Sequence, residues 1–163
     1  MTKELTHLTK DGQITMVDVS DKAQTKRLAQ AEAFVSLSKE TLALLKAQAL
    51  PKGDCLACAR VGAIMAAKKT AELIPLCHPI MTSFIDVRFT VLDEPPTIHI
   101  VSEARSVGET GVEMEAIIAA EMAATIIYDM CKAVQRDILI TGIRLLKKCG
   151  GKSGTYTAKG LGK

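Results

Sequence analysis

The chain has 163 residues, of which 48% are hydrophobic and only 3% aromatic, and its mean hydropathy is +0.19. Its net charge of +3, from 21 basic and 18 acidic residues, is too small to indicate nucleic-acid binding by itself. No stretch of about 18 residues is both apolar and free of charge, which argues against a transmembrane helix. The polar segment 1–12 lacks the apolar centre of a signal peptide. We therefore expect one cytoplasmic domain over residues 1–163, with residues 1–15 and 155–163 flexible.

The N-terminal part of the chain contains irregular and regular patterns in turn. Residues 1–21 are typical of irregular structure, apart from a short alternation over 16–20 that could pair at a sheet edge. Residues 22–33 have the composition of a helix, whereas the alternation over 33–37 predicts a strand. A helix should then begin at Ser38 or Lys39 and end before Pro51, because proline disfavours helix in the residue that precedes it.

Caps and alternation predict the remaining elements. Asp54 is a suitable N-cap for an alanine-rich helix over 55–73, which Pro75 stops. The alternating segments 83–92 and 97–104 flank a turn, so they should form an antiparallel hairpin. A long helix over 112–136 and a strand over 137–147 follow.

The order of these elements is strand, helices, strand, strand, helix, strand. It matches the β-α-β-β-α-β pattern, so we expect an α+β, ferredoxin-like sandwich in which helices cover one face of an antiparallel sheet. The other face would be bare in a monomer. High apolar content with few aromatic rings also fits buried subunit interfaces. We therefore expect a homo-oligomer, although a dense aliphatic core explains the composition too.

The helix predicted over 112–136 carries different chemical groups at its two ends. Glu113 and Glu115 lie in the first turn, where the helix dipole favours negative charge. Asp129 and Lys132 lie four to five turns later, three residues apart and on one face. The residues between are almost wholly apolar, so the helix should be buried, where charged groups are costly unless paired or used. This pattern favours a reaction site over an exposed ion pair.

Other segments carry groups suited to anion binding. Lys52 lies just before a predicted helix N-terminus, where free backbone amides attract phosphates. Pro79 holds His78 in an extended conformation. The glycine-rich segment with Lys148 and Lys152 has no acid and could grip a phosphate, but it lacks the spacing of a P-loop. Each of these residues could also be an ordinary surface or structural residue.

Five cysteines are present, and an odd number without a signal peptide favours free thiols. Cys55 and Cys58 form a CxxC pair, and Cys77 is followed by His78, so a zinc or redox site is conceivable. No second CxxC follows, and the pair falls in an alanine-rich helical pattern. Small core residues are the favoured interpretation, and we predict no metal site.

Taken together, these segments resemble the MoaC family. The resemblance extends from about Leu5 to Gly154, and its motifs are long and occur in the family order. Two features depart from the family pattern: the Cys55–Cys58 pair is absent from it, and Glu109 stands where a lysine is frequent. The matching blocks are Met16–Ser20, Arg27, Lys52–Asp54, Ile74–Pro79, Thr110–Ala116, Tyr128–Val134 and Gly151–Gly154.

The resemblance implies a lyase of molybdenum cofactor biosynthesis. Family members convert (8S)-3′,8-cyclo-7,8-dihydroguanosine 5′-triphosphate to cyclic pyranopterin monophosphate and pyrophosphate, and a radical S-adenosylmethionine cyclase makes that substrate from GTP. It further implies a ferredoxin-like fold and a homohexamer, a trimer of dimers, with each site at a subunit interface. We expect no resident cofactor, although magnesium can accompany the triphosphate.

The resemblance also implies a role for individual residues. Asp129 is the catalytic acid/base, and Lys52 and Lys132 are the essential lysines. We hypothesise that these three handle the proton transfers, since a lysine near other cations has a lowered pKa. Residues Arg27, His78, Lys148 and Lys152 would hold the triphosphate. The full set of implied substrate-binding residues is Asp18, Arg27, Leu76, Cys77, His78, Glu113, Met114, Glu115, Lys148 and Lys152.

Three other functions fit parts of the sequence. A non-catalytic ferredoxin-like regulatory module would bind a nucleotide or pterin and leave it intact. An RNA-binding module would need stacking aromatic residues on its central strands, but Phe84 and Phe89 lie on opposite faces of their predicted strand. A metal or redox protein would use the cysteines.

Overall fold

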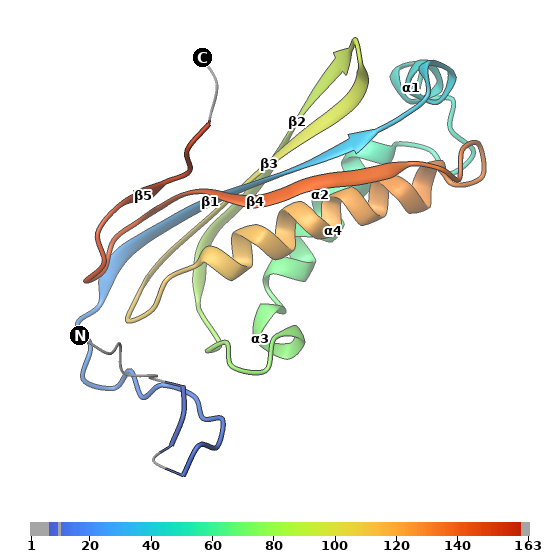
Figure 1. Ribbon diagram of the computed structural model, residues 1–163. Coiled ribbons are helices and arrows are strands. Elements are labelled where there is room, and N and C mark those ends of the chain that lie inside the picture. Colours follow the sequence, from blue (N-terminus) through green and yellow to red (C-terminus); the bar gives the residue numbers. More distant parts are fainter. Residues whose placement is uncertain (1–6, 10, 161–163) are drawn as a thin grey trace.

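This computed structural model describes residues 7–9 and 11–160, which form five strands and four helices (Figure 1). The expected flexibility of residues 1–6, 10 and 161–163 lies outside the described residues. In chain order the elements are β1 (Thr25–Ser36), α1 (Lys39–Lys46), α2 (Cys55–Ala67), α3 (Thr70–Leu73), β2 (Thr82–Asp93), β3 (Pro96–Gly108), α4 (Glu113–Cys131), β4 (Leu139–Cys149) and β5 (Tyr156–Thr157).

The five strands form one open sheet in the order β2-β3-β1-β4-β5, with every neighbouring pair antiparallel. The predicted hairpin is confirmed as β2 and β3. The strand predicted over 137–147 is confirmed as β4, displaced by two residues. Helices α2 and α4 lie on one face of the sheet (Figure 1), so the predicted α+β class is confirmed.

The helix predicted over 22–33 is wrong, because most of that segment belongs to the central strand β1. Its alanine, lysine and glutamine residues favour helix in isolation. In the fold, however, β1 pairs with β3 on one side and β4 on the other, which satisfies its backbone hydrogen bonds on both edges. Ala29, Ala31 and Ala33 alternate onto the helix-covered face and are fully buried.

Small side chains let the two helices and the sheet approach closely. Helix α4 faces β1, β3 and β4 with a run of buried alanines, and α2 packs beside α4 and against β2. At Gly62 in α2, an added Cβ would lie 2.2 Å from the Cδ1 atom of Ile126, so a larger residue there would displace the Ile126 side chain. This close packing fixes the position of α2 relative to α4.

The ends of the helices differ from the sequence prediction in detail. The predicted caps are confirmed, since the side chains of Ser38 and Asp54 accept hydrogen bonds from backbone amides in the first turns of α1 and α2. The continuous helix predicted over 55–73 is interrupted at Lys68 and Lys69. Helix α4 ends at Cys131, five residues earlier than predicted, and residues 16–20 form no strand.

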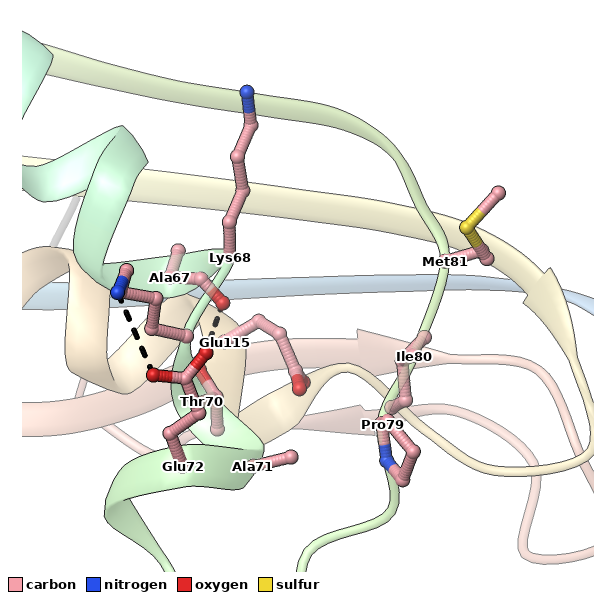
Figure 2. Close-up of a pocket in the computed structure, with 10 residues that line it drawn as sticks. Ala67, Lys68, Thr70, Ala71, Glu72, Pro79, Ile80, Met81 and Glu115 are labelled. Carbon is pink, nitrogen blue, oxygen red and sulfur yellow. Dashed lines mark hydrogen bonds and ion pairs between the residues drawn. The ribbon is translucent and has the colours of Figure 1, made fainter.

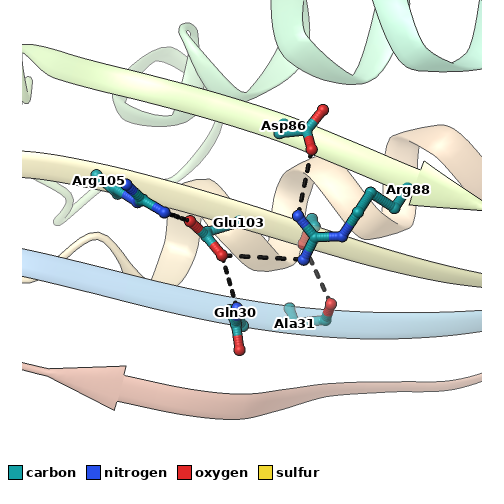
Figure 3. Close-up of polar contacts among 7 residues, drawn as sticks. Gln30, Ala31, Asp86, Arg88, Glu103 and Arg105 are labelled. Atoms are coloured by element: carbon teal, nitrogen blue, oxygen red, sulfur yellow. Dashed lines mark hydrogen bonds and ion pairs between the residues drawn. The ribbon is translucent and has the colours of Figure 1, made fainter.

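The sheet face opposite the helices carries two nearly buried carboxylates with charged partners. Glu103 accepts hydrogen bonds from Gln30 and Arg105, both at 2.6 Å, and Arg88 lies 3.9 Å away (Figure 3). The Arg105 guanidinium also lies 4.8 Å from the centre of the Phe84 ring. The polar atoms of Glu103 are thus satisfied within the chain, as burial of a charge requires.

The second carboxylate on this face is Glu32, whose side chain is 3% exposed. It accepts a hydrogen bond from Arg144 at 2.7 Å and pairs with His99 at 2.8 Å. The imidazole of His99 in turn stacks on the ring of Phe34. Long side chains therefore shield this face without a helical layer.

The described C-terminal residues continue the sheet. Strand β5 pairs with β4 through Lys147 and Lys148, although it lies within the segment 155–163 that we expected to be flexible. None of the helices in the described residues is both long enough and apolar enough to span a membrane.

Candidate active site

Helix α4 connects the two regions that contain the predicted site residues. Its C-terminal end carries Asp129 and Lys132, and its N-terminal end carries Glu113, Met114 and Glu115. Sixteen residues separate Glu113 from Asp129, which corresponds to about 24 Å along a helix that rises about 1.5 Å per residue. The structure therefore divides the predicted residues into two groups within one chain.

The C-terminal group is an ion-paired triad of Lys52, Asp129 and Lys132. Lys52 lies in the turn before α2, and its Nζ atom donates to Oδ2 of Asp129 at 2.5 Å. Lys132, which caps the C-terminus of α4, places Nζ 2.8 Å from Oδ1 of the same carboxylate. Both oxygens of Asp129 are thus engaged by ammonium groups from two different segments.

The triad is accessible to solvent, contrary to our expectation that the helix would bury its charged groups. The three side chains are 41–51% exposed. Helix α4 is indeed buried along its alanine face, but Asp129 and Lys132 lie where that helix reaches the surface. An exposed ion pair contributes little to stability, so the triad is better suited to contacting a ligand than to stabilising the fold.

Hydrogen bonds set the protonation states in the triad. The bonds from Lys132 and Lys52 lower the pKa of Asp129 to about 2, so its carboxylate is ionised at neutral pH. The same hydrogen bond to Asp129 raises the pKa of Lys132 above its usual value. Our expectation that a lysine pKa would be lowered by neighbouring cations is wrong for Lys132, because the carboxylate lies between the two lysines.

The N-terminal group surrounds a cavity of about 500 Å³ at the start of α4. His78 lies in its wall, and the Nε2 atom of His78 is 2.8 Å from the backbone oxygen of Val17. The residues that line the cavity include six of the predicted binding residues: Leu76, Cys77, His78, Glu113, Met114 and Glu115.

Glu115 is the most perturbed acid of this cavity. Its side chain is buried, and its Oε2 atom has no hydrogen-bond partner among the described residues. Burial raises the pKa of Glu115, and the nearby charge of Glu113 raises it further. Glu115 also reaches a smaller cavity between α3 and the segment that contains Pro79 and Met81 (Figure 2). A buried carboxyl between two cavities is a candidate proton carrier.

A second cavity, of about 590 Å³, adjoins the first and shares Lys22, Thr110, Gly111 and Glu113 with it. Its other charged residues include Arg27, Lys148 and Lys152 from the predicted set, together with Glu109. Four cationic side chains against two carboxylates, Glu109 and Glu113, give this hollow a net positive lining, which favours anions.

Two glycines shape this cationic cavity. At Gly151, where φ is +75°, an added Cβ would lie 1.7 Å from Nη1 of Arg27, so only glycine lets the loop fold against the guanidinium. Arg27 is held from the other side, where it donates to the backbone oxygens of Gly108 at 3.2 Å and Glu109 at 2.9 Å. At Gly111 an added Cβ would lie 1.9 Å from Oε2 of Glu113. The positive φ accounts for the glycine at position 151, whereas at position 111 the Glu113 side chain could move aside.

One predicted residue lies apart from both groups, and several lining residues were missed. Asp18 lines neither cavity, and it accepts hydrogen bonds from the backbone and hydroxyl of Ser20. Lys22 lines both cavities but was not among the predicted residues. Its position four residues after Asp18, close to a matching block, was the available signal. Within residues 7–9 and 11–160 no group of three His, Cys, Asp or Glu side chains is arranged to hold a metal ion.

These two groups of residues are typical of an enzyme that handles an anionic substrate. Comparison with known proteins also places the chain in an enzyme family. The model of the MoaC family matches residues 16–151, so the chain belongs to the MoaC family. It is 58% identical to the cyclic pyranopterin monophosphate synthase of Desulfovibrio desulfuricans over 158 residues, which cover 97% of both chains. It is 59% identical to the synthase of that name from Nitratidesulfovibrio vulgaris, covering 94% of this chain and 95% of the other. The synthase of Oleidesulfovibrio alaskensis is 54% identical, over 97% of this chain and 99% of its own.

Proposed function

We infer that the chain is a cyclic pyranopterin monophosphate synthase, a lyase of molybdenum cofactor biosynthesis. It converts (8S)-3′,8-cyclo-7,8-dihydroguanosine 5′-triphosphate to cyclic pyranopterin monophosphate and pyrophosphate. The observation that carries this conclusion is 54–59% identity to three synthases of that name over nearly the whole chain. Those names also favour an enzyme over the non-catalytic regulatory module.

The cationic cavity is suited to the triphosphate. Arg27, Lys148, Lys152 and Lys22 surround it, and fixed cations stabilise the charge that develops on a departing pyrophosphate. Arg27 is held by two backbone carbonyls and by the glycine loop, so its guanidinium needs little reorganisation when the substrate binds. The adjoining cavity, with His78 and Glu115, would then receive the nucleoside part.

The triad supplies groups that move protons. Opening a purine and rebuilding it as a pterin requires protons to be added to and removed from nitrogen. In the chain without substrate Asp129 is ionised and Lys132 holds its proton more tightly than a free lysine, so the substrate would have to separate this ion pair before either group could transfer a proton. Lys52 approaches the same carboxylate from the turn before α2.

The separation of the two groups supports an active site shared between subunits. Reacting atoms must approach within about 3–3.5 Å of catalytic groups, but about 24 Å of helix separates Asp129 from Glu113 in one chain. One substrate can therefore contact a triad and a cavity together only if they come from different protomers. We propose a homohexamer, a trimer of dimers, in which each site joins a triad to a neighbour's cavities.

The surface offers apolar side chains for such an assembly. Val61 and Met65, one turn apart on the outer side of α2, are each 59% exposed. We also propose that the domain, spanning 1–163, is ferredoxin-like, since the order β2-β3-β1-β4 and the helices on one face fit that pattern. Burying exposed apolar residues between subunits would offset the cost of association.

The proposal also covers the cofactor, the metal ion and the source of the substrate. The chain would need no resident cofactor, and magnesium would arrive with the triphosphate. A radical S-adenosylmethionine cyclase would supply the substrate from GTP. The cytoplasmic location stays a prediction.

Product analysis with the cyclised nucleotide tests the proposed function. The purified chain is incubated with that compound, and the mixture is separated by chromatography while pyrophosphate is measured. We expect the substrate to be replaced by a pterin and pyrophosphate in equal amounts. Substrate that stays intact would contradict the proposal and favour the regulatory module.

A further inference from the structure

A half-buried carboxylate, Glu109, lines the cationic cavity to which we assign the triphosphate. Glu109 follows directly after β3 and shares the wall of this cavity with Arg27 and Lys148. A negative charge at this place opposes the binding of a polyanion. The roles proposed above give Glu109 no part in binding or in proton transfer, so its presence among the cations needs a separate explanation.

Two hydrogen bonds hold Glu109, one through its side chain and one through its backbone. Its Oε1 atom accepts a hydrogen bond from Nε2 of Gln24 at 2.9 Å. Its backbone oxygen accepts from Nη2 of Arg27, also at 2.9 Å. Because the partner of the side chain is a neutral amide, this contact does not cancel the negative charge. Because the contact with Arg27 uses the backbone, a change of the Glu109 side chain leaves it in place.

The Glu109 side chain is charged under physiological conditions. The hydrogen bond from Gln24 lowers the pKa of Glu109, and the charge of Arg27 lowers it further. The carboxylate is therefore ionised at neutral pH. Any anion that enters the cavity meets this negative charge together with the surrounding cations.

The proposed reaction places two different polyanions in the same cavity. The triphosphate occupies it before bond cleavage, and pyrophosphate occupies it afterwards. The substrate also has a nucleoside part that the adjoining cavity would hold, whereas pyrophosphate has only the cationic cavity. Fixed cations that stabilise the departing group also retain the product, and product release limits the turnover of many enzymes. A carboxylate beside the cations weakens this retention.

We propose that the Glu109 carboxylate promotes the release of pyrophosphate from the cationic cavity. This inference rests on the proposed function for the identity of the ligand. The negative charge acts on substrate and product alike, but the substrate keeps its contacts in the adjoining cavity. Glu109 thus sets how long the product stays bound and contributes nothing to the chemistry at the reacting atoms.

Titration calorimetry of the full chain with sodium pyrophosphate, in the absence of magnesium, tests this role. Glu109→Gln removes the charge, while the new amide oxygen can still accept the hydrogen bond from Gln24. We expect the Kd of this variant for pyrophosphate to be at least about threefold lower than that of the wild type at low salt, as expected for one solvent-exposed charge. The difference should shrink as added salt screens the charge. Added pyrophosphate should also inhibit the variant synthase at correspondingly lower concentrations.

Two control variants separate the charge of Glu109 from its contact and from the net charge of the protein. Gln24→Ala removes the hydrogen bond but keeps the carboxylate. Glu121→Gln removes the same charge from an exposed position in the middle of α4. Both controls should bind pyrophosphate as the wild type does.

Three results would overturn the proposal. Glu109→Gln binds pyrophosphate no more tightly than the wild type, either control reproduces its effect, or neither the variant nor the wild type binds pyrophosphate. Binding needs no turnover, so this result is separate from the product analysis. Substrate that stays intact, together with the expected change in Kd, would contradict the proposed function and still establish the effect of Glu109 on pyrophosphate binding.

Discussion

The two ends of α4 differ in exposure, in charge and in what they can do. The C-terminal end presents an open triad in which one carboxylate pairs with two lysines. The N-terminal end adjoins two cavities, one lined by cations and one by a buried acid with a raised pKa. The C-terminal end thus carries the groups to which we assign proton transfer, and the N-terminal end carries those to which we assign substrate binding.

In the proposed shared site, neither end is complete by itself. Among the described residues, the two cavities at the start of α4 include none of Lys52, Asp129 and Lys132 in their walls. The cavities have cations and His78 but lack the lysine–carboxylate pair. A division of one site over about 24 Å is expected when an enzyme assembles its sites between subunits.

The largest effect should follow from removing the charge of the triad. Asp129→Asn keeps the shape of the side chain but loses the carboxylate, so kcat should fall at least about 100-fold, as expected for loss of an acid/base group. Glu121→Gln, an exposed change on the same helix, is the matched control and should leave kcat unchanged. Steady-state pyrophosphate release measures both. Near-normal turnover in Asp129→Asn would remove the triad from the chemistry.

A smaller effect, on binding, should follow from a change at the cationic cavity. Arg27→Ala removes a charge-assisted contact to the triphosphate, so KM should rise about 10-fold or more. Lys26→Ala removes the same charge from the neighbouring, exposed position of β1 and controls for net charge. If both variants raise KM equally, the effect belongs to the overall field of the protein and not to the cavity.

The smallest effect concerns the thermal stability of the folded chain and follows from the buried acid Glu115. Because the pKa of Glu115 is raised in the folded chain, its ionisation favours unfolding, and stability is lost as pH rises from the usual pKa of 4.5 through the folded value. Glu115→Gln lacks this loss. Its Tm should exceed that of the wild type at neutral pH, by about 2–4 °C for each kcal/mol, and the difference should shrink towards about pH 4. Thermal melts across this range measure it, and a difference independent of pH would contradict a raised pKa.

The sequence predicted the hairpin and the long helix well, because their patterns are strong locally. The segment 83–104 alternates with a clear turn, and β2 and β3 follow it. Strand β1 could not be predicted from its own residues, since its alanines and glutamine favour helix and only pairing with β3 and β4 overrides them. The lysine pair at 68–69 likewise gave no local signal of a break in the helix.

The roles of the candidate site residues stay predictions, and the sequence indicated their arrangement only in part. Helical spacing alone placed Glu113 and Asp129 four to five turns apart, and α4 is long enough to hold them there. The raised pKa of Lys132 follows from Asp129 three residues earlier, a local pair, whereas the contact of Lys52 with Asp129 depends on how α2 meets α4, which no local pattern encodes. Lys22 was missed because it lies in an irregular segment whose path over the cavities is set by tertiary contacts.

Complementation between two impaired variants tests the shared site most directly, provided that the substrate concentration lies below the wild-type KM, where the raised KM of Arg27→Ala suppresses turnover. Asp129→Asn and Arg27→Ala chains are dissociated, mixed in equal amounts and reassembled, and pyrophosphate release is measured. With random assembly, about one quarter of the sites would join an intact triad to an intact cavity, so activity should return to about that fraction of wild type. The control mixture of Lys52→Ala with Asp129→Asn should stay inactive, because the structure pairs both residues within one chain. Failure of the first mixture to recover, with reassembly verified by native mass spectrometry, would contradict a site shared between protomers.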